Sequence, residues 1–167
     1  EHIGRAVSWL TLFMVLVQMA VVLLRYVFGV GWIALQESIL YMHGTVFLVA
    51  AGYTLVHDGH VRIDIFYRSA SARRKAATNL LGSVCLLLPM AAAIFWIAWP
   101  YVMQSWSVFE KSPEGSGIPA VFLLKTVILV YAALLALQGI ALALRSVLTL
   151  AGVTPPPPPG DGATEPV

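Results

Sequence analysis

The sequence has few charged residues, a single cysteine and no motif that indicates catalysis. Charged residues make up 11% of the chain and hydrophobic residues 59%, whereas about 25% of the residues in a soluble domain are charged. The chain also lacks a nucleophile beside a base, an HExxH or paired-cysteine motif, a phosphate-binding glycine loop and a pair of broken helices. We therefore expect neither a soluble domain nor an enzyme, and no basic patch with interleaved aromatic residues indicates nucleic acid.

Four long apolar stretches take up most of the chain instead. They are Ala6 to Phe28, Ser38 to Val56, Ala76 to Val102 and Ala120 to Leu144. A helix needs about 20 mainly apolar residues to cross a hydrocarbon core roughly 30 Å thick, and a secretory signal would supply only one region of about 7 to 15 residues. The sequence predicts an all-α, polytopic membrane protein with four transmembrane helices in one domain, residues 1–150.

The tail at residues 151–167 has a different composition. Five consecutive prolines, Pro155 to Pro159, are followed by glycine and polar residues. Such a segment is extended or disordered, and it can also bind aromatic grooves on other proteins. An unstructured cytoplasmic tail is the interpretation that we favour.

The basic residues predict the orientation of the chain in the membrane. One group lies before the first stretch, between the second and third, or after the fourth: Arg5, Arg62, Arg68, Arg73, Arg74, Lys75 and Arg145. A smaller group lies on the other side: Arg25, Lys111 and Lys125. Lys and Arg close to span ends are retained in the cytoplasm, so both termini and the middle loop are expected there.

The third stretch contains the single cysteine and two prolines. Cys85 has no partner, so disulfides have no role in this fold. Pro89 and Pro100 remove backbone donors from the helix ladder. They predict a kink or an early end of this helix.

Two charged residues at the outer ends of the first two stretches allow two interpretations. Arg25 lies near the end of the first stretch and Glu37 just before the second. In one interpretation Arg25 extends to the headgroups and Glu37 caps the next helix. In the other they form polar contacts with each other or with a partner protein.

The histidines do not predict a metal or haem site. His43 is the only histidine well inside a stretch, so paired axial ligands on facing helices are missing and a hydrogen-bonded packing residue is expected. His57, His60 and Asp64 have the spacing of one helix face, but Gly59 interrupts that helix. We expect no metal here and no cofactor in this chain.

Small residues recur along the fourth stretch, at Ala132, Ala136, Gly139 and Ala143. Their spacing of i, i+4, i+7 and i+11 places them on one helix face, and small residues allow close approach of two helix backbones. Packing within this chain and contact with a partner explain this helix-packing seam equally well.

Three segments together resemble the small permease subunit of TRAP transporters, the DctQ type. They are Arg25-Tyr26-Val27-Phe28, then Trp32 and Glu37 leading into Tyr41 and Gly44, and the loop Gly59-His60-Val61-Arg62-Ile63-Asp64. Lys125 and Gln138-Gly139 are similar too, and the resemblance covers roughly Arg5 to Arg145. It implies partner-interface or structural roles for Arg25, Tyr26, Trp32, Glu37, Gly59, His60, Arg62, Asp64 and Lys125.

The resemblance implies a sodium-driven secondary transporter in a bacterial inner membrane, with three components. A large permease of about a dozen spans would hold the substrate and sodium sites. A periplasmic binding protein would capture an organic acid such as a dicarboxylate, a keto acid or sialic acid. The present chain would be the scaffold of the large permease, with a role in docking the periplasmic protein.

Three alternatives from other classes remain open. The small subunit of a tripartite tricarboxylate transporter would also have about four spans, but it is not expected to carry the Gly59 to Asp64 loop. An independent small exporter would need an acidic residue inside the membrane, and none lies in the middle of a stretch. A haem-binding electron carrier would need a partner for His43.

Overall fold

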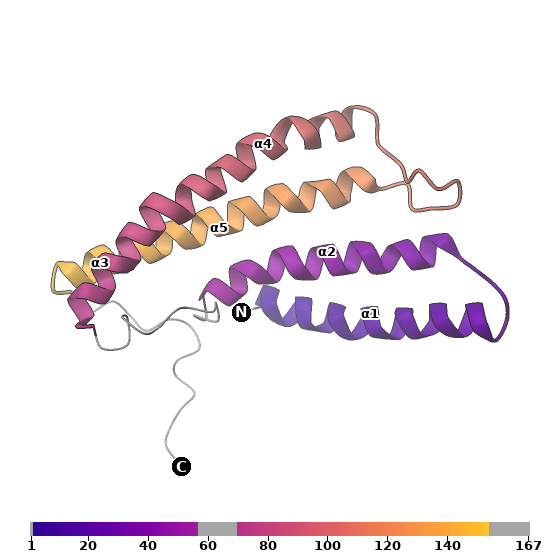
Figure 1. Cartoon of the computed structure of the whole chain (residues 1–167), viewed down its shortest axis with the longest axis horizontal. Helices are drawn as coiled ribbons and strands as arrows, with labels where there is room; N and C mark the ends of the chain where they lie inside the picture. Colours follow the sequence, from indigo (N-terminus) through magenta and orange to yellow (C-terminus); the bar gives the residue numbers. More distant parts are fainter. Residues whose placement is uncertain (1, 57–69, 154–167) are drawn as a thin grey trace, which may run out of the picture.

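The computed structural model describes residues 2–56 and 70–153, and it describes side chains in residues 9–50 and 70–153. The elements, shown in Figure 1, are α1 (His2–Tyr26), α2 (Ile33–Val56), α3 (Ala72–Gly82), η1 (Ser83–Leu87), α4 (Leu88–Ser107) and α5 (Val121–Leu150). This described part contains no strand. Four helical units are long and apolar enough to cross a membrane, namely α1, α2, the continuous α3–η1–α4 unit and α5. The predicted fold class is therefore confirmed, and the chain is a multi-pass membrane protein.

Two of the helical units begin earlier than the apolar stretches that predicted them, in segments with polar residues. Helix α2 begins at Ile33 rather than Ser38, and the third unit begins at Ala72 rather than Ala76. The added turns contain polar side chains such as Gln36 and Arg73. Such residues lower the mean hydropathy of a stretch of sequence, so they lie outside the apolar stretches. They do not interrupt the backbone hydrogen bonds of a helix.

A tight turn joins α1 to α2. Gly29 has a φ of +67°, a left-handed conformation that glycine adopts without steric penalty. The N–H of Val30 bonds to the Leu24 carbonyl at 2.9 Å, which satisfies one of the acceptors that a helix end leaves free. The chain therefore reverses direction within a few residues, and α1 and α2 form a hairpin.

The third unit is one helix with a wider turn inside it. At η1 the N–H of Leu88 bonds to the carbonyl of Ser83, five residues back, instead of four as in an α-helix. Pro89 follows directly and has no N–H to donate, so the wide turn lies where the regular ladder is interrupted. The helix continues through Pro100, so the expected early end does not occur.

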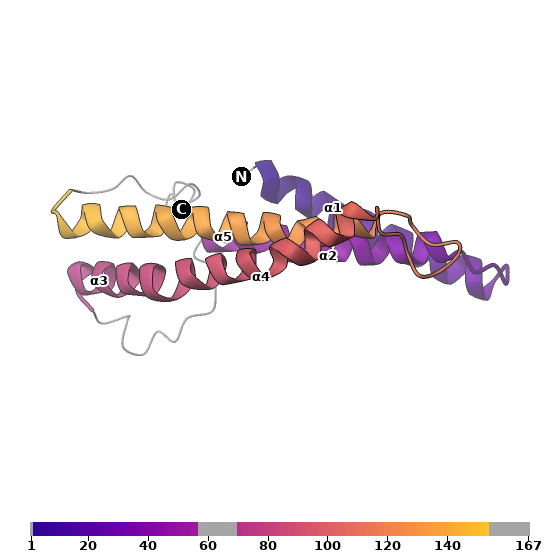
Figure 2. The ribbon, with the colours of Figure 1, turned by 90° about the horizontal axis from the view of Figure 1, so that it is seen from above.

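The four long units lie in a row rather than in a closed bundle. Helix α1 contacts α2, α2 contacts α5, and α5 contacts α4 together with α3. Figure 1 shows the same order, with α5 between α2 and α4, and Figure 2 shows α5 running alongside α3 and α4. Among the described elements α1 packs against α2 and no other helix. The row therefore has two open edges, formed by α1 and α4.

The small core lies between α5 and the third unit. Its buried apolar residues are Ala76, Ala91, Val102, Leu129, Ala132 and Leu135. Buried serines accompany them, and Ser146 on α5 donates to the Leu142 carbonyl of its own helix at 2.8 Å. Such back-bonding lets a hydroxyl lie in an apolar contact without an unpaired donor.

The helix-packing seam on α5 takes part in this contact. Ala132 and Gly139 are buried, while Ala136 and Ala143 are partly exposed. A Cβ atom on Gly139 would lie 3.0 Å from Cδ2 of Leu88 and 3.2 Å from Cδ2 of Leu87. At Gly139, therefore, the absence of a side chain allows close packing within this chain.

Most of the remaining surface of the helices is apolar and exposed. In α1, none of the 18 residues from Trp9 to Tyr26 is buried. Trp96 and Ile97 on α4 are 82% and 72% exposed. In a membrane these faces contact lipid or another protein.

We predict that Gly139→Leu lowers the stability of the chain by about 1–3 kcal/mol, because the new side chain overpacks the contact with Leu87 and Leu88. Thermal unfolding of the purified chain in detergent would measure the loss. Gly82→Leu is the matched control, since a Cβ there has no atom within 4 Å. Equal melting temperatures for the two variants would contradict the prediction.

Candidate functional site

The end of the molecule that carries the α1–α2 and α4–α5 connections has a network of polar contacts. Glu37 lies in α2, and its carboxylate accepts a hydrogen bond from the backbone N–H of Ile118 at 2.7 Å. The same carboxylate accepts a hydrogen bond from the hydroxyl of Ser112. Glu37 thus binds the connection between α4 and α5 rather than capping its own helix, which corrects one of the two expectations from the sequence.

Gly117 allows the chain to close tightly around this carboxylate. A Cβ atom at Gly117 would lie 2.7 Å from Oε1 of Glu37 and 2.3 Å from Oγ of Ser112. Both distances are shorter than non-bonded atoms tolerate, so a larger residue would displace the loop. The N–H of Gly117 bonds to the Glu114 carbonyl at 3.0 Å, which closes the turn.

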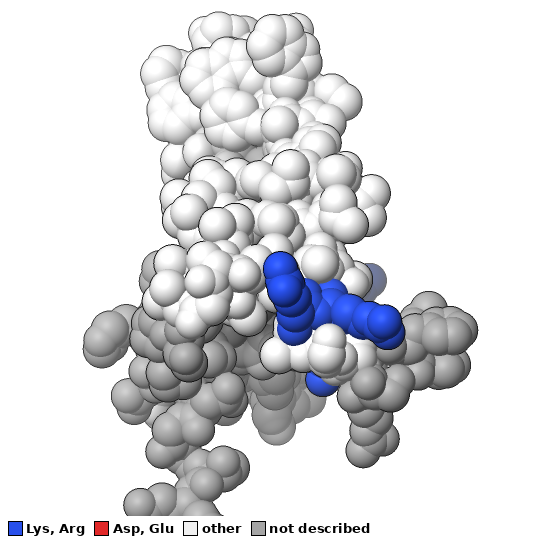
Figure 3. Space-filling view, turned by 90° about the vertical axis from the view of Figure 1, so that its left-hand side faces the viewer, with Lys and Arg blue, Asp and Glu red and all other residues white. Residues whose placement is uncertain are grey.

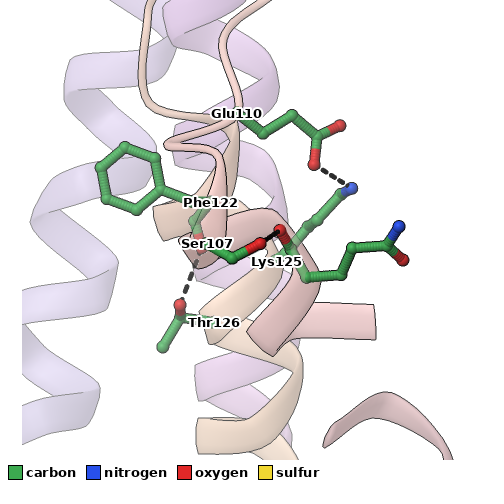
Figure 4. A network of polar contacts seen from close by, with 6 residues as sticks. Ser107, Glu110, Phe122, Lys125 and Thr126 are labelled. Atoms are coloured by element: carbon green, nitrogen blue, oxygen red, sulfur yellow. Dashed lines mark hydrogen bonds and ion pairs between the residues drawn. The ribbon is translucent and has the colours of Figure 1, made fainter. Parts of the chain in front are cut away.

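An ion pair joins the base of the same connection to α5. Nζ of Lys125 lies 2.5 Å from Oε2 of Glu110, and Figure 4 shows the two side chains pointing toward each other. The ammonium also lies 4.0 Å from the ring centroid of Tyr101 on α4, within the range of a cation–π contact. Lys125 therefore links α4, the connection and α5.

The pKa of Glu110 lies below its ordinary value of 4.5, first because Lys125 donates a hydrogen bond to the carboxylate. The side chains are partly shielded from solvent, with Lys125 15% and Glu110 37% exposed. Hydrogen bonding and a nearby positive charge both favour the charged carboxylate. The pair is therefore maintained at neutral pH.

Three aromatic rings pack beside the ion pair. The rings of Trp106 and Phe122 lie 4.7 Å apart, and those of Phe109 and Phe122 lie 5.7 Å apart. Trp106 also donates from Nε1 to the hydroxyl of Thr126 at 2.9 Å. Phe109 has a φ of +44°, which is unusual for a residue with a side chain, and its ring also lies 6.4 Å from that of Trp106.

Three other residues at this end that the family resemblance suggested, Arg25, Tyr26 and Trp32, are accessible. Tyr26 is 80% and Trp32 is 61% exposed, and Arg25 is exposed in the last turn of α1. Together with Gln36, the side chains of Arg25 and Trp32 line a pocket of about 20 Å³. That volume has room for about one water molecule, so the pocket is too small for an organic acid.

The structure does not bring Arg25 and Glu37 together. The one ion pair recorded among the described side chains is that between Lys125 and Glu110. His43 lies exposed on α2, with its ring 6.3 Å from that of Phe47. The sequence had led us to expect that His43 packs between helices. In the structure it does not pack between helices of this chain.

The inner-loop residues Gly59, His60, Arg62 and Asp64 lie outside the described residues, and so does His57, whose spacing to His60 and Asp64 was considered above for a metal site and not expected to form one. Among the side chains of residues 9–50 and 70–153, no group of three or more His, Cys, Asp or Glu can hold a metal ion. The structure therefore leaves the inner-loop predictions as predictions.

Sequence reasoning did not identify the partners of Glu37 and Lys125. Ser112, Gly117 and Glu110 lie in a short segment that contains serine, glycine, proline and both signs of charge. Such a composition indicates an irregular connection, but it does not show which helix the connection binds.

A comparison with protein families identifies relatives of the chain. The family described as "Tripartite ATP-independent periplasmic transporters, DctQ component" matches residues 14–149. The matched range includes α2, α4, the connection between α4 and α5, and nearly all of α5. No curated protein matches the chain.

We predict that Glu37→Ala lowers the free energy of local opening of the connection between α4 and α5 by about 1–3 kcal/mol. The reason is that the Ile118 N–H and the Ser112 hydroxyl lose the carboxylate that accepts their hydrogen bonds. Hydrogen exchange at the Ile118 amide would be faster in this variant. Glu114→Ala is the matched control, because Glu114 lies exposed in the same connection. Unchanged exchange at Ile118 in the Glu37 variant would show that the contact does not order the connection.

We also predict that the stability of the connection between α4 and α5 depends on pH, because Glu110 pairs with Lys125 at its base. A carboxyl group with a lower pKa in the folded state stabilises that state above its unfolded pKa, and the contribution is lost as the pH falls through the folded pKa. The stabilising effect of Glu110 is therefore complete above pH 4.5 and decreases in more acidic solution. Hydrogen exchange at the backbone amides of residues 108–120, compared between the natural chain and Glu110→Gln at several pH values, would measure this stabilising effect. A difference that grows on acidification would contradict the assigned sign.

Proposed function

Since the chain belongs to the DctQ family of tripartite ATP-independent periplasmic transporters, we propose that it braces the large permease subunit within the membrane. The family consists of transporter components and not of enzymes. A tripartite transporter also has a large permease and a periplasmic binding protein as components. The present chain is the small membrane component, and its mechanical role is our proposal.

The open row of helices is the observation that supports a bracing role. Helix α1 packs only against α2 among the described elements, and its residues from Trp9 to Tyr26 are all unburied. A protein that worked alone in the membrane through an internal site would need helices arranged around that site. A row with broad apolar faces is instead suited to lying along a larger helical protein, which it would widen and stiffen.

The distribution of polar groups supports placing the transport sites in another subunit. The helices of the described part carry one acidic residue, Glu37, and its carboxylate is occupied by the connection at Ile118 and Ser112. Coordination of sodium or an organic acid requires polar groups near the middle of the membrane. We propose that the large permease supplies these groups, in a sodium-driven uptake system of the bacterial inner membrane for dicarboxylates, keto acids or sialic acid.

The orientation of the chain follows from its charges in this proposal. The end with α3 and its basic residues would face the cytoplasm, together with both termini. The end with the polar network would face the periplasm. Arg25 and Trp32, which are exposed there, are then available to the periplasmic binding protein, whereas Glu37 would act indirectly by ordering the connection between α4 and α5.

The inner loop would have a separate role. His60, Arg62 and Asp64 belong to the segment that most closely resembles the family, and we propose that they anchor the loop between α2 and α3 at the cytoplasmic surface. Loss of Asp64 would then weaken assembly or uptake without changing which substrate is chosen.

Co-purification tests the proposal. The chain would be tagged, native membranes solubilised gently, and the proteins that remain bound identified by mass spectrometry. We expect one much larger polytopic protein in a one-to-one ratio. Recovery of the chain alone, or as a homo-oligomer, would instead indicate an independent four-helix membrane protein.

The same experiment with Asp64→Ala addresses the inner loop. We expect a lower yield of the large protein, or slower uptake with unchanged substrate preference. Asp58→Ala is a matched control, since it removes a nearby carboxylate outside the His60–Asp64 segment. Normal assembly and uptake in the Asp64 variant would show that this residue is dispensable.

A further inference from the structure

The wide turn η1 leaves backbone acceptors of the third unit without their helical donors. In a regular α-helix the Val84 carbonyl would accept from the N–H of Leu88, but that N–H donates to Ser83. The Cys85 carbonyl would accept from residue 89, which is Pro89 and has no N–H. The next N–H along the chain serves one of these two carbonyls at most. At least one carbonyl of this turn therefore needs a donor from elsewhere.

These carbonyls lie on the side of the unit that α5 does not cover. Val84, Cys85 and Pro89 are all exposed. Helix α4 packs against α5, and Ala91 is buried in that contact. Pro89 lies two residues before Ala91, which is about 200° around a helix. Figure 1 shows α4 at the edge of the row, so among the described elements no second helix covers this face.

The one hydroxyl of η1 is already used. Ser83 donates it to the carbonyls of Asn79 and Leu80, at 2.7 Å and 3.1 Å. Cys85 adds a thiol, which is only a weak donor. The side chains of η1 therefore do not replace the missing donors.

The turn lies where lipid has no donor to offer. Cys85 comes ten residues after Lys75, so α3 and the start of η1 place it about 15 Å from a side chain that extends to the headgroups. The hydrocarbon core is roughly 30 Å thick, so Cys85 is close to its middle. Carbonyls that a proline frees at such a depth are satisfied by neighbouring helices, hydroxyl side chains or ordered water, because acyl chains cannot donate.

We propose that the α4 edge, at η1 and Pro89, is the face that binds the large permease, through a transmembrane helix that presents a hydroxyl or carboxamide donor at this depth. Serine, threonine, asparagine and glutamine are the side chains that form such bonds between membrane helices. Helix α1 has no proline and no wide turn, so the opposite edge of the row has no such need and contacts lipid. The proposal rests on the proposed function for the existence of the large subunit, and it adds which edge that subunit covers and by which chemistry.

Photo-crosslinking in native membranes tests which edge is covered. The photoreactive residue p-benzoylphenylalanine replaces Leu86, which is exposed in η1, or Leu16, which is exposed on α1 and serves as the matched position. We expect the Leu86 variant to crosslink to the same large polytopic protein that co-purifies with the natural chain, with a yield several times that of the Leu16 variant.

The other outcomes of crosslinking separate this proposal from the proposed function. Equal yields at the two positions, or a product from Leu16 alone, would overturn the assignment of the edge and leave the proposed function intact. So would a Leu86 product that contains lipid or a second copy of this chain. Failure of the natural chain to co-purify with any large polytopic protein would overturn both.

Pro89→Ala tests the chemistry of the contact, because it returns an N–H to the helix and lets the chain serve its own carbonyl. We expect the variant to bind the large protein about two- to twelvefold more weakly, as for the loss of one hydrogen bond. The melting temperature of the variant alone in detergent should be unchanged or higher. Unchanged binding would overturn the proposal. A lower melting temperature together with weaker binding would also overturn it, since the proline would then act on the fold of the chain.

Pro100→Ala is the matched control. Pro100 also lies exposed inside α4, and it frees the carbonyl of Trp96. Trp96 comes 11 residues after Cys85, about 16 Å further along the unit and therefore at the opposite headgroup level, where water can donate. We expect binding of the large protein to be unchanged in this variant. A loss equal to that of Pro89→Ala would contradict the assigned depth of the contact and overturn the proposal.

Discussion

Close packing of α5 against both of its neighbours is the constraint on which the arrangement depends. In lipid, apolar side chains gain little by leaving their solvent, so helices associate through close contacts between their backbones. Gly139 supplies such a contact toward the third unit, and Gly44 on α2 supplies another toward Leu124, whose Cδ1 would lie 3.2 Å from a Cβ at Gly44. Because α5 is the described helix that contacts both α2 and α4, these small residues connect the two halves of the row.

The two ends of the molecule use charge in different ways. At one end two carboxylates are satisfied within the chain, since Glu37 binds the connection and Glu110 pairs with Lys125. At the other end the first turn of α3 carries Arg73, Arg74 and Lys75, and Figure 3 shows Lys and Arg side chains gathered on the described surface there. The first end is thus ordered by contacts between the connection and the helices.

The sequence was informative where lipid imposes a simple rule, and less so where two distant segments meet. Runs such as Val121–Leu150 need only be apolar and long to predict a helix, and all four helical units were found. The contact between Glu37 and Ile118 joins residues 81 positions apart, and no local pattern specifies it. His43 was misplaced for a related reason, because the row leaves exposed a face of α2 that a closed bundle would have buried.

The place of α5 between α2 and α4 has a consequence for assembly. Helix α5 is the last of the four to leave the ribosome, yet the first hairpin and the α3–α4 unit share no contact among the described elements without it. The two earlier parts must therefore remain separate in the membrane until α5 is inserted between them. Truncation before α5 would leave the two parts on one chain but without a packing contact between their described helices. The row is therefore completed from its middle, after the helices at both edges have been made.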